Sequence, residues 1–319
     1  MSSERDWRPT ASLAALRERA RILEDIRQFF RSRGVLEVET PLLSAATVPD
    51  LHLDSLRCRP AGSPDPLYLQ TSPEYAMKRL LAAGSGPIFQ LTKAFRDGEA
   101  GPRHNPEFTL LEWYRPGFDH HALMDEMDEL LTDVLGVPAA DRLTYEGAFL
   151  AHAGVDPHRA SVEDLRRRAL KLGLSDLEGL DRDGWLDLLL SHVVEPQLGR
   201  NRPTFLHDFP ESQAALAKIR PGDPPLGERF EVFVEGLELA NGFHELTDAA
   251  EQRRRFTRDR DRRREQGRHV PPLDERFLAA LEAGLPPSAG VALGVDRLVM
   301  LALGATEISE VLAFPVGRA

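Results

Sequence analysis

Apolar residues recur at intervals of three and four near the start of the chain, and this spacing predicts an amphipathic helix. The helix is marked by Leu16, Ala20, Leu23, Ile26 and Phe30. Gly34 is typical of the position just after a helix C-terminus. The next stretch, VLEVETPLL, favours a strand that Pro41 confines to a sheet edge or to the end of the strand. Such a helix and strand can pair with a second copy across a two-fold axis or belong to one core, and the pattern leaves both open.

A polar loop between two strand-like runs is the next feature. The run PIFQLTKAFR ends in Arg96, and the run EFTLLEWYR follows the loop. The loop itself carries Arg103, His104 and Asn105, which are polar or cationic groups that a simple connection between strands does not need. The placement therefore raises the question of what anion these side chains meet.

Helical patterns dominate the middle of the chain. LYLQTSPEYAMKRLLAAG predicts a short strand and then a helix, with Thr71 or Ser72 as its cap and Pro73 in its first position. Residues 120–225 favour helices and loops. We interpret them as a mainly helical insertion in a single domain that spans residues 1–319.

The last third of the chain returns to strands. Phe230, Val232 and Val234 alternate with other side chains, as a half-buried strand requires. EQRRRFTRDRDRRREQGR predicts a charged helix whose arginines are offset by neighbouring acids. SAGVALGVDRLVMLALGA predicts a Gly-rich strand that turns into an apolar helix near Asp296.

Composition narrows the class of protein. The chain has 319 residues, of which 42% are hydrophobic and 29% charged, as in ordinary globular proteins. It has no apolar run of the roughly 20 residues that span a bilayer, and MSSERDWRPT has no signal-peptide core. The single cysteine, Cys58, excludes an internal disulfide and a thiolate metal cluster. We therefore expect a cytoplasmic protein with no membrane partner, and the net charge of −11 argues against a nucleic-acid partner.

Two arginines stand where an anion would explain them. Arg96 ends a strand, and Arg297 begins a helix just after Gly294. A guanidinium group binds two phosphate oxygens at once, and a Gly-rich turn lets a ligand approach the backbone. Taken one at a time, each arginine is better explained by a pair with an acidic residue of the protein.

Carboxylates form a complementary set. Glu231 and Glu238 lie seven residues apart around Gly236, and a β-bulge there would bring them to one side. Two carboxylates beside ligand phosphates are a usual arrangement for Mg²⁺. Further polar groups that can line an acidic pocket are Glu74, Glu112, Tyr114 and Glu245. An acidic pocket beside arginines predicts two ligands, a polyphosphate and an ammonium compound. Walker A, GxGxxG, GxSxG and HExxH motifs are absent from the sequence.

Three segments together resemble the class II aminoacyl-tRNA synthetases, and in particular lysyl-tRNA synthetases. The first helix with EVETP is similar to motif 1, FRDGEAGPRHNPEFTLLEWY to motif 2 and GVALGVDRL to motif 3. TSPEY and ELANGFHELTD add to a match that covers nearly the whole chain. The resemblance implies an α+β catalytic domain, an antiparallel sheet flanked by helices, and a homodimer built on the helix at 16–33 and the strand to Pro41.

The resemblance also implies ATP as co-substrate, probable Mg²⁺, and roles for individual residues. Arg96 and Arg297 are the implied catalytic residues, on the α- and γ-phosphates, and Glu231 and Glu238 the implied metal ligands. The implied ATP site consists of Arg96, Asp97, Gly98, Glu99, Arg103, His104, Asn105, Glu238, Leu239, Gly294 and Arg297. The implied amino-acid site consists of Ser72, Pro73, Glu74, Glu112, Tyr114, Asn241, Glu245 and Ala292. The substrate carboxylate would attack the α-phosphorus, and catalysis would rest on positioning and charge stabilisation.

The short segment before motif 1 suggests which molecule accepts the acyl group. Lysyl-tRNA synthetases carry an anticodon-binding barrel there, whereas about fifteen residues precede the helix in this sequence. We therefore expect no anticodon-binding domain. The shortened lysyl-type form resembles the family of elongation factor P–(R)-β-lysine ligases, which implies transfer of the acyl group to a lysine side chain of elongation factor P. Alternatives are a minimal lysyl-tRNA synthetase, a non-catalytic regulatory paralogue and an amide ligase that uses ammonia.

Two positions depart from the lysyl pattern. Motif 2 usually has Arg-x-Glu, but the sequence here is Arg96-Asp97-Gly98-Glu99, so the glutamate is displaced by one residue. Asp97, Glu99 or the backbone at Gly98 could replace it. Motif 3 has Ala292 where lysyl-tRNA synthetases tend to have glycine. Since one methyl group can shift selectivity by about 1–3 kcal/mol, we hypothesise that Ala292 favours a β-amino acid.

Overall fold

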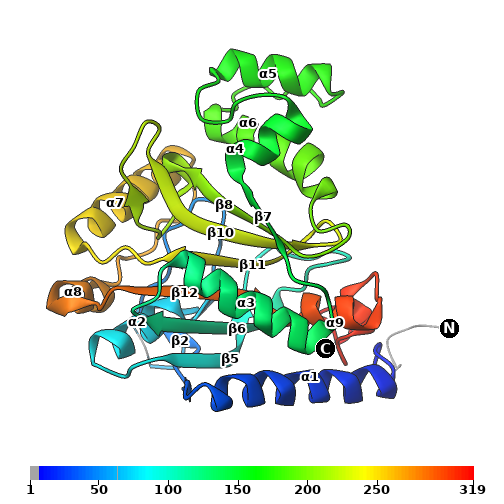
Figure 1. The fold of residues 1–319 in the computed structure, drawn as a ribbon. Helices are drawn as coiled ribbons and strands as arrows, with labels where there is room; N and C mark the ends of the chain where they lie inside the picture. Colours follow the sequence, from blue (N-terminus) through cyan, green and yellow to red (C-terminus); the bar gives the residue numbers. More distant parts are fainter. Residues whose placement is uncertain (1–6, 63) are drawn as a thin grey trace. The chain divides into compact units, whose positions relative to one another are not determined.

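The computed structural model describes residues 7–62 and 64–319 of the chain (Figure 1). Residues 1–6, which belong to the segment used to predict the absence of a signal peptide, lie outside the described residues. The backbone divides into two compact units, which are taken separately below. The first unit comprises Met1–Tyr114, Thr247–Pro286 and Ala292–Ala319. The second comprises Arg115–Leu246 and Pro287–Val291.

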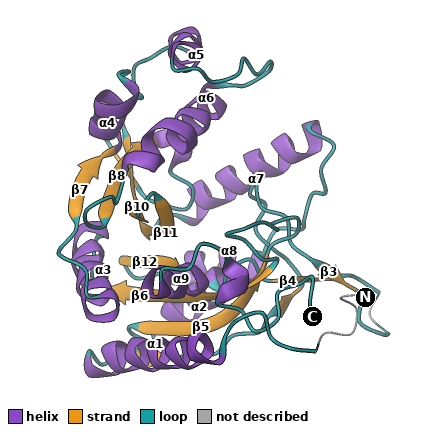
Figure 2. Cartoon of the chain, turned by 90° about the vertical axis from the view of Figure 1, so that its right-hand side faces the viewer, coloured by secondary structure: helices purple, strands orange, loops and turns teal. Residues whose placement is uncertain are grey.

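The first unit is built around a long helix and two paired strands. Helix α1 begins after Ser12, whose hydroxyl accepts from the Ala15 N–H, and ends before Gly34, whose φ is +67°. It buries Ile22 and Phe30, and the Phe30 ring stacks on Phe89 of β5. Figures 1 and 2 show the helix running alongside β5. Strand β1 pairs parallel with β5, and β5 pairs antiparallel with β6. These elements are α1 (Leu13–Ser32), β1 (Leu36–Glu37), β5 (Ile88–Phe95) and β6 (Glu107–Pro116).

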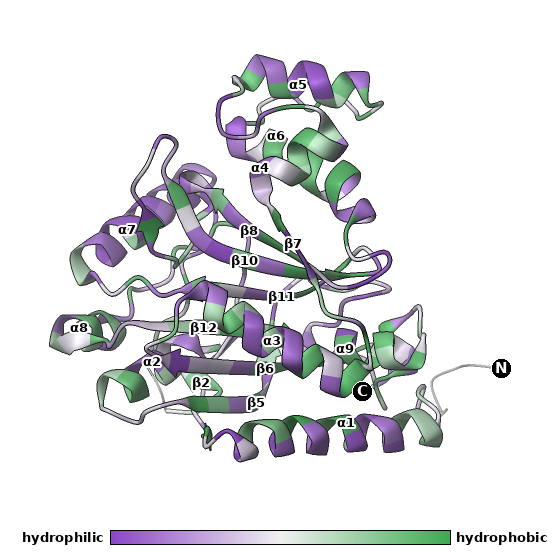
Figure 3. Cartoon of the chain, in the orientation of Figure 1, coloured by the Kyte–Doolittle hydropathy of each residue, from purple (hydrophilic) through white to green (hydrophobic). Residues whose placement is uncertain are grey.

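The remaining elements of the first unit include a small three-stranded sheet, with strand order β2-β4-β3, and four further helices. Helix α7 appears mostly hydrophilic in Figure 3, and acids offset its arginines as predicted: Arg253, for example, pairs with Glu275 at 2.7 Å. The elements are β2 (Leu43–Ser44), β3 (Arg57–Cys58), β4 (Leu67–Leu69), α2 (Glu74–Ala82), α7 (Ala249–Glu265), α8 (Glu275–Gly284) and α9 (Val295–Leu303). Strand β12 (Ser288–Gly294) leads directly into α9, close to the predicted boundary at Asp296.

A buried polar contact ties the three motif segments of the first unit together. Arg19 on α1 forms an ion pair of 2.7 Å with Asp296 on α9, and its other terminal nitrogen donates to the Thr109 hydroxyl at 2.9 Å. The Thr109 N–H on β6 donates to the second Asp296 oxygen at 2.7 Å. Because Asp296 is almost fully buried, both of its oxygens need such partners. Motif 1, motif 2 and motif 3 are therefore held to one another by a single carboxylate.

The second unit combines a four-stranded sheet with a helical subregion. Its strand order is β11-β10-β8-β7, with β9 paired to one end of β10. The apolar cluster under α4, α5 and α6 includes Tyr145, Phe149 and Trp185. The elements are α3 (His120–Leu135), β7 (Asp141–Thr144), α4 (Tyr145–Ala148), α5 (Val162–Lys171), α6 (Arg182–Leu189), β8 (Thr204–Pro210), β9 (Ile219–Arg220), β10 (Leu226–Val234) and β11 (Leu237–His244).

The predicted α+β class is confirmed, and the pairs β5–β6, β8–β10 and β10–β11 are antiparallel as expected. The parallel pairs β1–β5 and β7–β8 were not predicted. Residues 120–225 contain the predicted helices, but they also contain β7, β8 and β9, which the helical interpretation missed. In the described part of the chain, no helix is both long enough and apolar enough to cross a bilayer.

Candidate active site

The polar loop of motif 2 is a closed hairpin in the first unit. The Arg96 N–H donates to the Pro106 carbonyl at 2.9 Å where the two strands part. Nearer the tip, Gly101 and His104 exchange backbone hydrogen bonds of 3.1 and 3.2 Å. Gly98, at φ +80°, takes a backbone conformation that other residues rarely adopt. The glycine that displaces the motif 2 glutamate therefore forms the bend of this hairpin.

The two predicted catalytic arginines lie on this hairpin and next to it. Arg96 stacks over the Phe108 ring at 5.0 Å and approaches Glu99 at 3.6 Å, and its Nε has no hydrogen-bond partner among the described residues. Arg297 donates from Nη2 to His104 Nε2 at 2.5 Å, so that ring nitrogen must be the acceptor. Both guanidinium groups therefore lie at the motif 2 hairpin, and such groups are suited to an anionic ligand.

The other loop residues divide by exposure. Arg103 is exposed, as a residue that closes over a ligand would be. Asn105 is buried instead, and its amide donates to the Glu107 carbonyl at 2.6 Å and accepts from the Val316 N–H at 2.9 Å. The side chain of Asn105 is thus committed to holding the hairpin against the C-terminal segment.

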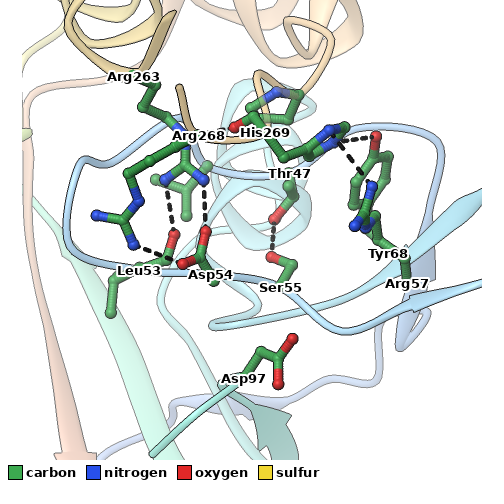
Figure 4. Close-up of a pocket in the computed structure, with 12 residues that line it drawn as sticks. Thr47, Leu53, Asp54, Ser55, Arg57, Tyr68, Asp97, Arg263, Arg268 and His269 are labelled. Atoms are coloured by element: carbon green, nitrogen blue, oxygen red, sulfur yellow. Dashed lines mark hydrogen bonds and ion pairs between the residues drawn. The ribbon is translucent and has the colours of Figure 1, made fainter. Parts of the chain in front are cut away.

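Asp97 lines a polar cavity of about 270 Å³ in the first unit (Figure 4). Its N–H donates to the Asp54 carbonyl at 2.8 Å, and the carboxylate of Asp54 is bound by Arg263 and by Arg268, the latter at 2.5 Å. Figure 4 draws the Asp97 carboxylate without a protein partner among the lining residues. The cavity is lined by Thr47, Val48, Leu53, Asp54, Ser55, Arg57, Tyr68, Asp97, Arg263, Arg268, His269 and Pro271.

A buried carboxylate forms the centre of the predicted amino-acid site in the first unit. Alternation along β6 puts Glu112 and Tyr114 on one face of the strand. The Tyr114 hydroxyl donates to one oxygen of Glu112 and the Ser72 hydroxyl to the other, each at 2.6 Å. Helix α2 begins at Glu74, one residue later than predicted, and Pro73 is its N-cap. The Ser72 hydroxyl also accepts a hydrogen bond from the Glu74 N–H, at 3.0 Å.

Burial sets the chemistry of this carboxylate. Glu112 is 2% exposed, and burial together with the charge of Glu74 raises its pKa to about 7, although both hydroxyl donors act in the opposite direction. Lys78, which the sequence analysis missed, is 1% exposed, and its ammonium lies 2.5 Å from Glu74. Its position four residues after Glu74 on a predicted helix is the signal that could have found it. The site therefore already stabilises one buried ammonium group.

The hairpin of β10 and β11 carries the predicted metal ligands in the second unit. Glu235 and Gly236 both have positive φ, 53° and 71°, and make the turn. Val232 is opposite Ala240, but Phe233 is opposite Glu238, so one extra residue bulges from β11. The expected bulge exists, but it lies beyond Gly236, at the position of Leu239.

This bulge decides which side chains share a face. Glu231 is opposite Asn241, and cross-strand partners point to the same side of an antiparallel pair. In a regular ladder Glu238 would point to the other side, because a shift of one residue reverses the orientation. The bulge restores it, so Glu231, Glu238 and Asn241 lie on one face as predicted from the motif.

An arginine that the sequence analysis missed organises this face. Arg229 donates to Glu231, to the Asn241 side-chain oxygen at 3.2 Å and to the Gln213 carbonyl at 2.6 Å. Burial raises the pKa of Glu231 to about 8; Arg229 opposes this shift, and Glu238 adds to it. Every second residue of β10 lies on the same face, and Arg229 is two residues before Glu231. This alternation could have identified Arg229 from the sequence.

The remaining predicted residues are held by backbone contacts. In the second unit the Glu245 N–H donates to the Ser288 carbonyl at 2.9 Å, and Glu245 is 2% exposed. In the first unit Ala292 is half-buried on β12, and Gly294 is the N-cap of α9. The structure thus brings together Arg297 with His104, Glu112 with Ser72 and Tyr114, and Glu231 with Glu238 and Asn241.

Comparison with known proteins shows the family of this chain. The family model for class II tRNA synthetases (D, K and N) matches residues 4–318. The chain belongs to this family. Similar proteins include one from Proteus mirabilis (strain HI4320), 56% identical over the full length of both chains. Another, from Vibrio cholerae serotype O1, is 56% identical over 98% of this chain and 99% of the relative, and one from Klebsiella pneumoniae (strain 342) is 54% identical over both full lengths. All three are named elongation factor P–(R)-β-lysine ligase.

Proposed function

We propose that this protein is an ATP-dependent, AMP-forming ligase that activates (R)-β-lysine, or lysine, and transfers it to a lysine side chain of elongation factor P. The observation that carries the proposal is the buried Glu112, held by the hydroxyls of Ser72 and Tyr114 beside Glu74. A cationic amino acid is the ligand that stabilises such a carboxylate, because its ammonium supplies the missing charge. The relatives that match over their full length are named as (R)-β-lysine ligases, which supports the same substrate.

The motif residues have separable roles in this proposal. Arg96 binds the α-phosphate, and Arg297, with His104 and Arg103, binds the outer phosphates, since guanidinium groups match phosphate oxygens. Asp97, Gly98 and Glu99 take the adenosine side. The substrate carboxylate attacks the α-phosphorus, and pyrophosphate leaves. The amine of the acceptor lysine then attacks the acyl carbon, and AMP leaves. The protein supplies positioning and charge, and no protein nucleophile is needed.

Mg²⁺ fits the acidic face of the β10–β11 hairpin. Glu231 and Glu238 point to the same side, and burial and mutual repulsion raise the pKa of Glu231 to about 8. A cation at this face would relieve the repulsion, and two carboxylates with ATP phosphates are a set that Mg²⁺ prefers. When bound, the ion would neutralise charge on the phosphates. Arg229 keeps Glu231 oriented toward that role.

Two partners complete the proposal. Elongation factor P is the acceptor, by analogy with the relatives' printed names. A second copy of the chain is the other partner, through α1 and the segment to Pro41. This segment exposes Leu36, Leu42 and Leu43 to 56%, 38% and 40%, which supports a covered surface because leucines are more often buried.

A pyrophosphate-exchange assay with α-lysine, (R)-β-lysine and (S)-β-lysine tests the function. We expect the strongest exchange with (R)-β-lysine, and then acylation of elongation factor P but not of tRNA. Labelled lysine on tRNA would support the minimal lysyl-tRNA synthetase instead, and no exchange with any amino acid would support a regulatory paralogue.

The variant Ala292→Gly refines the same assay. Removing the methyl group should shift the preference from (R)-β-lysine toward α-lysine by about 10-fold, in line with the 1–3 kcal/mol that one methyl group contributes to selectivity. An unchanged ratio would contradict the hypothesis for Ala292 without affecting the proposed ligase activity.

A further inference from the structure

Histidines gather in the second unit at a place that the proposed ligase activity does not use. The chain has ten histidines, and four of them lie near the start of α3 and on β8 and β11. The His120 ring is 4.1 Å from His121 and 6.5 Å from His244, and the His121 ring is 5.6 Å from His207, centroid to centroid. Helix α3 packs against β10 and β11, so side chains from these elements meet.

Three side chains in this group offer donor atoms close together. His244 ends β11 and faces Glu228 of β10 across the ladder, and its Nδ1 lies 2.6 Å from Glu228 Oε2. His120 begins α3, after the cap residue Asp119. One donor atom from each of His120, Glu228 and His244 lies within 4.8 Å of the others. The three come from three elements, so their proximity is a product of tertiary structure.

His120 is the member of this group that lacks an explanation within the protein. It is 2% exposed, and neither ring nitrogen has a hydrogen-bond partner among the described residues. The Asp208 carboxylate lies 3.9 Å from Nε2, which is beyond hydrogen-bond distance. A buried polar group without a partner destabilises the folded chain, so a ligand that binds this imidazole would stabilise the fold.

We propose that His120, Glu228 and His244 form a binding site for a divalent transition metal ion, with Zn²⁺ as the best match. Two imidazoles and one carboxylate are a set that binds Zn²⁺ in proteins, with bonds of about 2.0–2.2 Å and a fourth position for water. Around a tetrahedral ion the donor atoms stand about 3.4 Å apart. The donor atoms lie within 4.8 Å of one another, and small rotations of the three side chains would bring them to the distance of about 3.4 Å that the ion requires.

The surroundings suit a metal ion. A carboxylate near the ring of a ligating imidazole is a common orienting partner, and the Asp208 carboxylate lies 3.9 Å from His120 Nε2. Asp208 is itself held by Arg220 at 2.8 Å.

The site has a different chemistry from the proposed Mg²⁺ site. Magnesium prefers oxygen ligands, and imidazole suits Zn²⁺ and other late transition metals. An ion here would join the first turn of α3 to the end of β11, which immediately precedes Glu245. We therefore assign it a structural role in holding the β10–β11 hairpin, separate from nucleotide binding.

Metal binding to the full-length, tag-free protein tests the site. After dialysis against chelator, the chain should bind Zn²⁺ at a ratio close to one per chain, and Co²⁺ should give visible absorption bands of a low-coordinate site. Excess Mg²⁺ should displace neither ion. His244→Gln and His120→Ala should each weaken Zn²⁺ binding by more than about 100-fold, because loss of a ligand exceeds the 10–100-fold effect of an orienting residue.

The neighbouring His121→Gln is the matched control, since His121 lies beside His120 but outside the set of three. It should bind Zn²⁺ as the unmodified chain does. The proposal is overturned if the unmodified chain binds neither Zn²⁺ nor Co²⁺ at micromolar concentration, if His244→Gln binds Zn²⁺ unchanged, or if His121→Gln loses binding equally. Bound metal is measured in every case, so none of these outcomes depends on ligase activity.

Discussion

The two units each bury a glutamate at the residues proposed to bind ligands, but they satisfy it differently. In the first unit Glu112 accepts from two hydroxyl groups, which are neutral donors. In the second unit Glu231 accepts from Arg229, which carries a full charge. Yet the pKa is raised in both cases, to about 7 and about 8, because burial dominates and a second acid adds to it, Glu74 for Glu112 and Glu238 for Glu231.

This difference teaches what each unit lacks. Glu112 accepts from two hydroxyl groups, and Lys78, whose charge lowers the pKa of Glu112, is paired with Glu74, so a bound ammonium group would complete the site. The Glu231 site has its cation already, and the excess negative charge comes from Glu238. A second cation, rather than a hydrogen-bond donor, would complete that site. The first unit is thus suited to the amino acid and the second to the metal ion.

The largest expected effect comes from Glu112→Gln, which keeps the shape of the side chain and removes its charge. Amino-acid activation should fall by about 150- to 5,000-fold, since losing one partner of a buried charge pair costs about 3–5 kcal/mol. The loss should appear mainly as weaker binding of the lysine substrate. Pyrophosphate exchange over a range of lysine concentrations measures it, and Glu282→Gln, on helix α8 and exposed, is the control. Full activity in Glu112→Gln would remove the basis for the proposed ammonium site.

The variants Glu231→Gln and Glu112→Gln should differ in how much each lowers the free energy of unfolding. At a pH above 8, where Glu231 is ionised, Glu231→Gln leaves Arg229 largely buried without its anion. Because guanidinium cannot lose its proton, we expect unfolding there to become easier by about 3 kcal/mol. Glu112→Gln leaves only rotatable hydroxyls, which can bond to an amide as well, and should cost less than about 1 kcal/mol. Urea denaturation without ligands measures both. Equal losses would show that the two carboxylates are satisfied alike.

Sequence reasoning found these sites unevenly, and the reason is physical. Glu112, Tyr114 and Ser72 were predicted from the lysyl-type motifs, and alternation along one strand and a helix start fix their directions locally. Glu231 and Glu238 were predicted to converge, but the bulge that turns Glu238 toward Glu231 lies at Leu239 and not at Gly236. A bulge depends on which residues pair across strands, and a single chain pattern does not contain that pairing.

Other features were missed because their partners are distant in sequence. Arg229 reaches Gln213 as well as its own strand, and Arg19 meets Asp296 from the other end of the chain. The strand β8 lies within a region whose helical signals are stronger, and its pairing with β10 decides its conformation. The metal site proposed for His120 is of the same kind, since three elements supply one donor each. Local periodicity predicts which face a residue occupies, whereas tertiary pairing decides what it meets.

The smallest expected effect is a difference in pH dependence, which again concerns Glu112. Its folded-state pKa of about 7 lies above the ordinary value of 4.5 for a glutamate, so over the range between them the folded chain holds a proton that the unfolded chain has lost. Stability is therefore greatest below pH 4.5 as far as this group is concerned and falls as the pH rises through 7. Between pH 6 and pH 8 the loss from Glu112 amounts to about 1 kcal/mol. Glu231 adds a loss in the same direction, because its pKa is also raised.

Glu112→Gln removes the first contribution and leaves the second. Its unfolding free energy should fall by about 1 kcal/mol less than that of the unmodified chain between pH 6 and pH 8, as measured by urea denaturation at both pH values. Saturating lysine should reduce the pH dependence of the unmodified chain, because an ammonium beside Glu112 lowers the pKa of the carboxyl and keeps it ionised at both pH values. If the unfolding free energies of the two proteins change with pH in parallel, Glu112 is already ionised below pH 6. The proposed contrast between Glu112, which lacks a bound cation, and Glu231, which is paired with Arg229, would then be wrong.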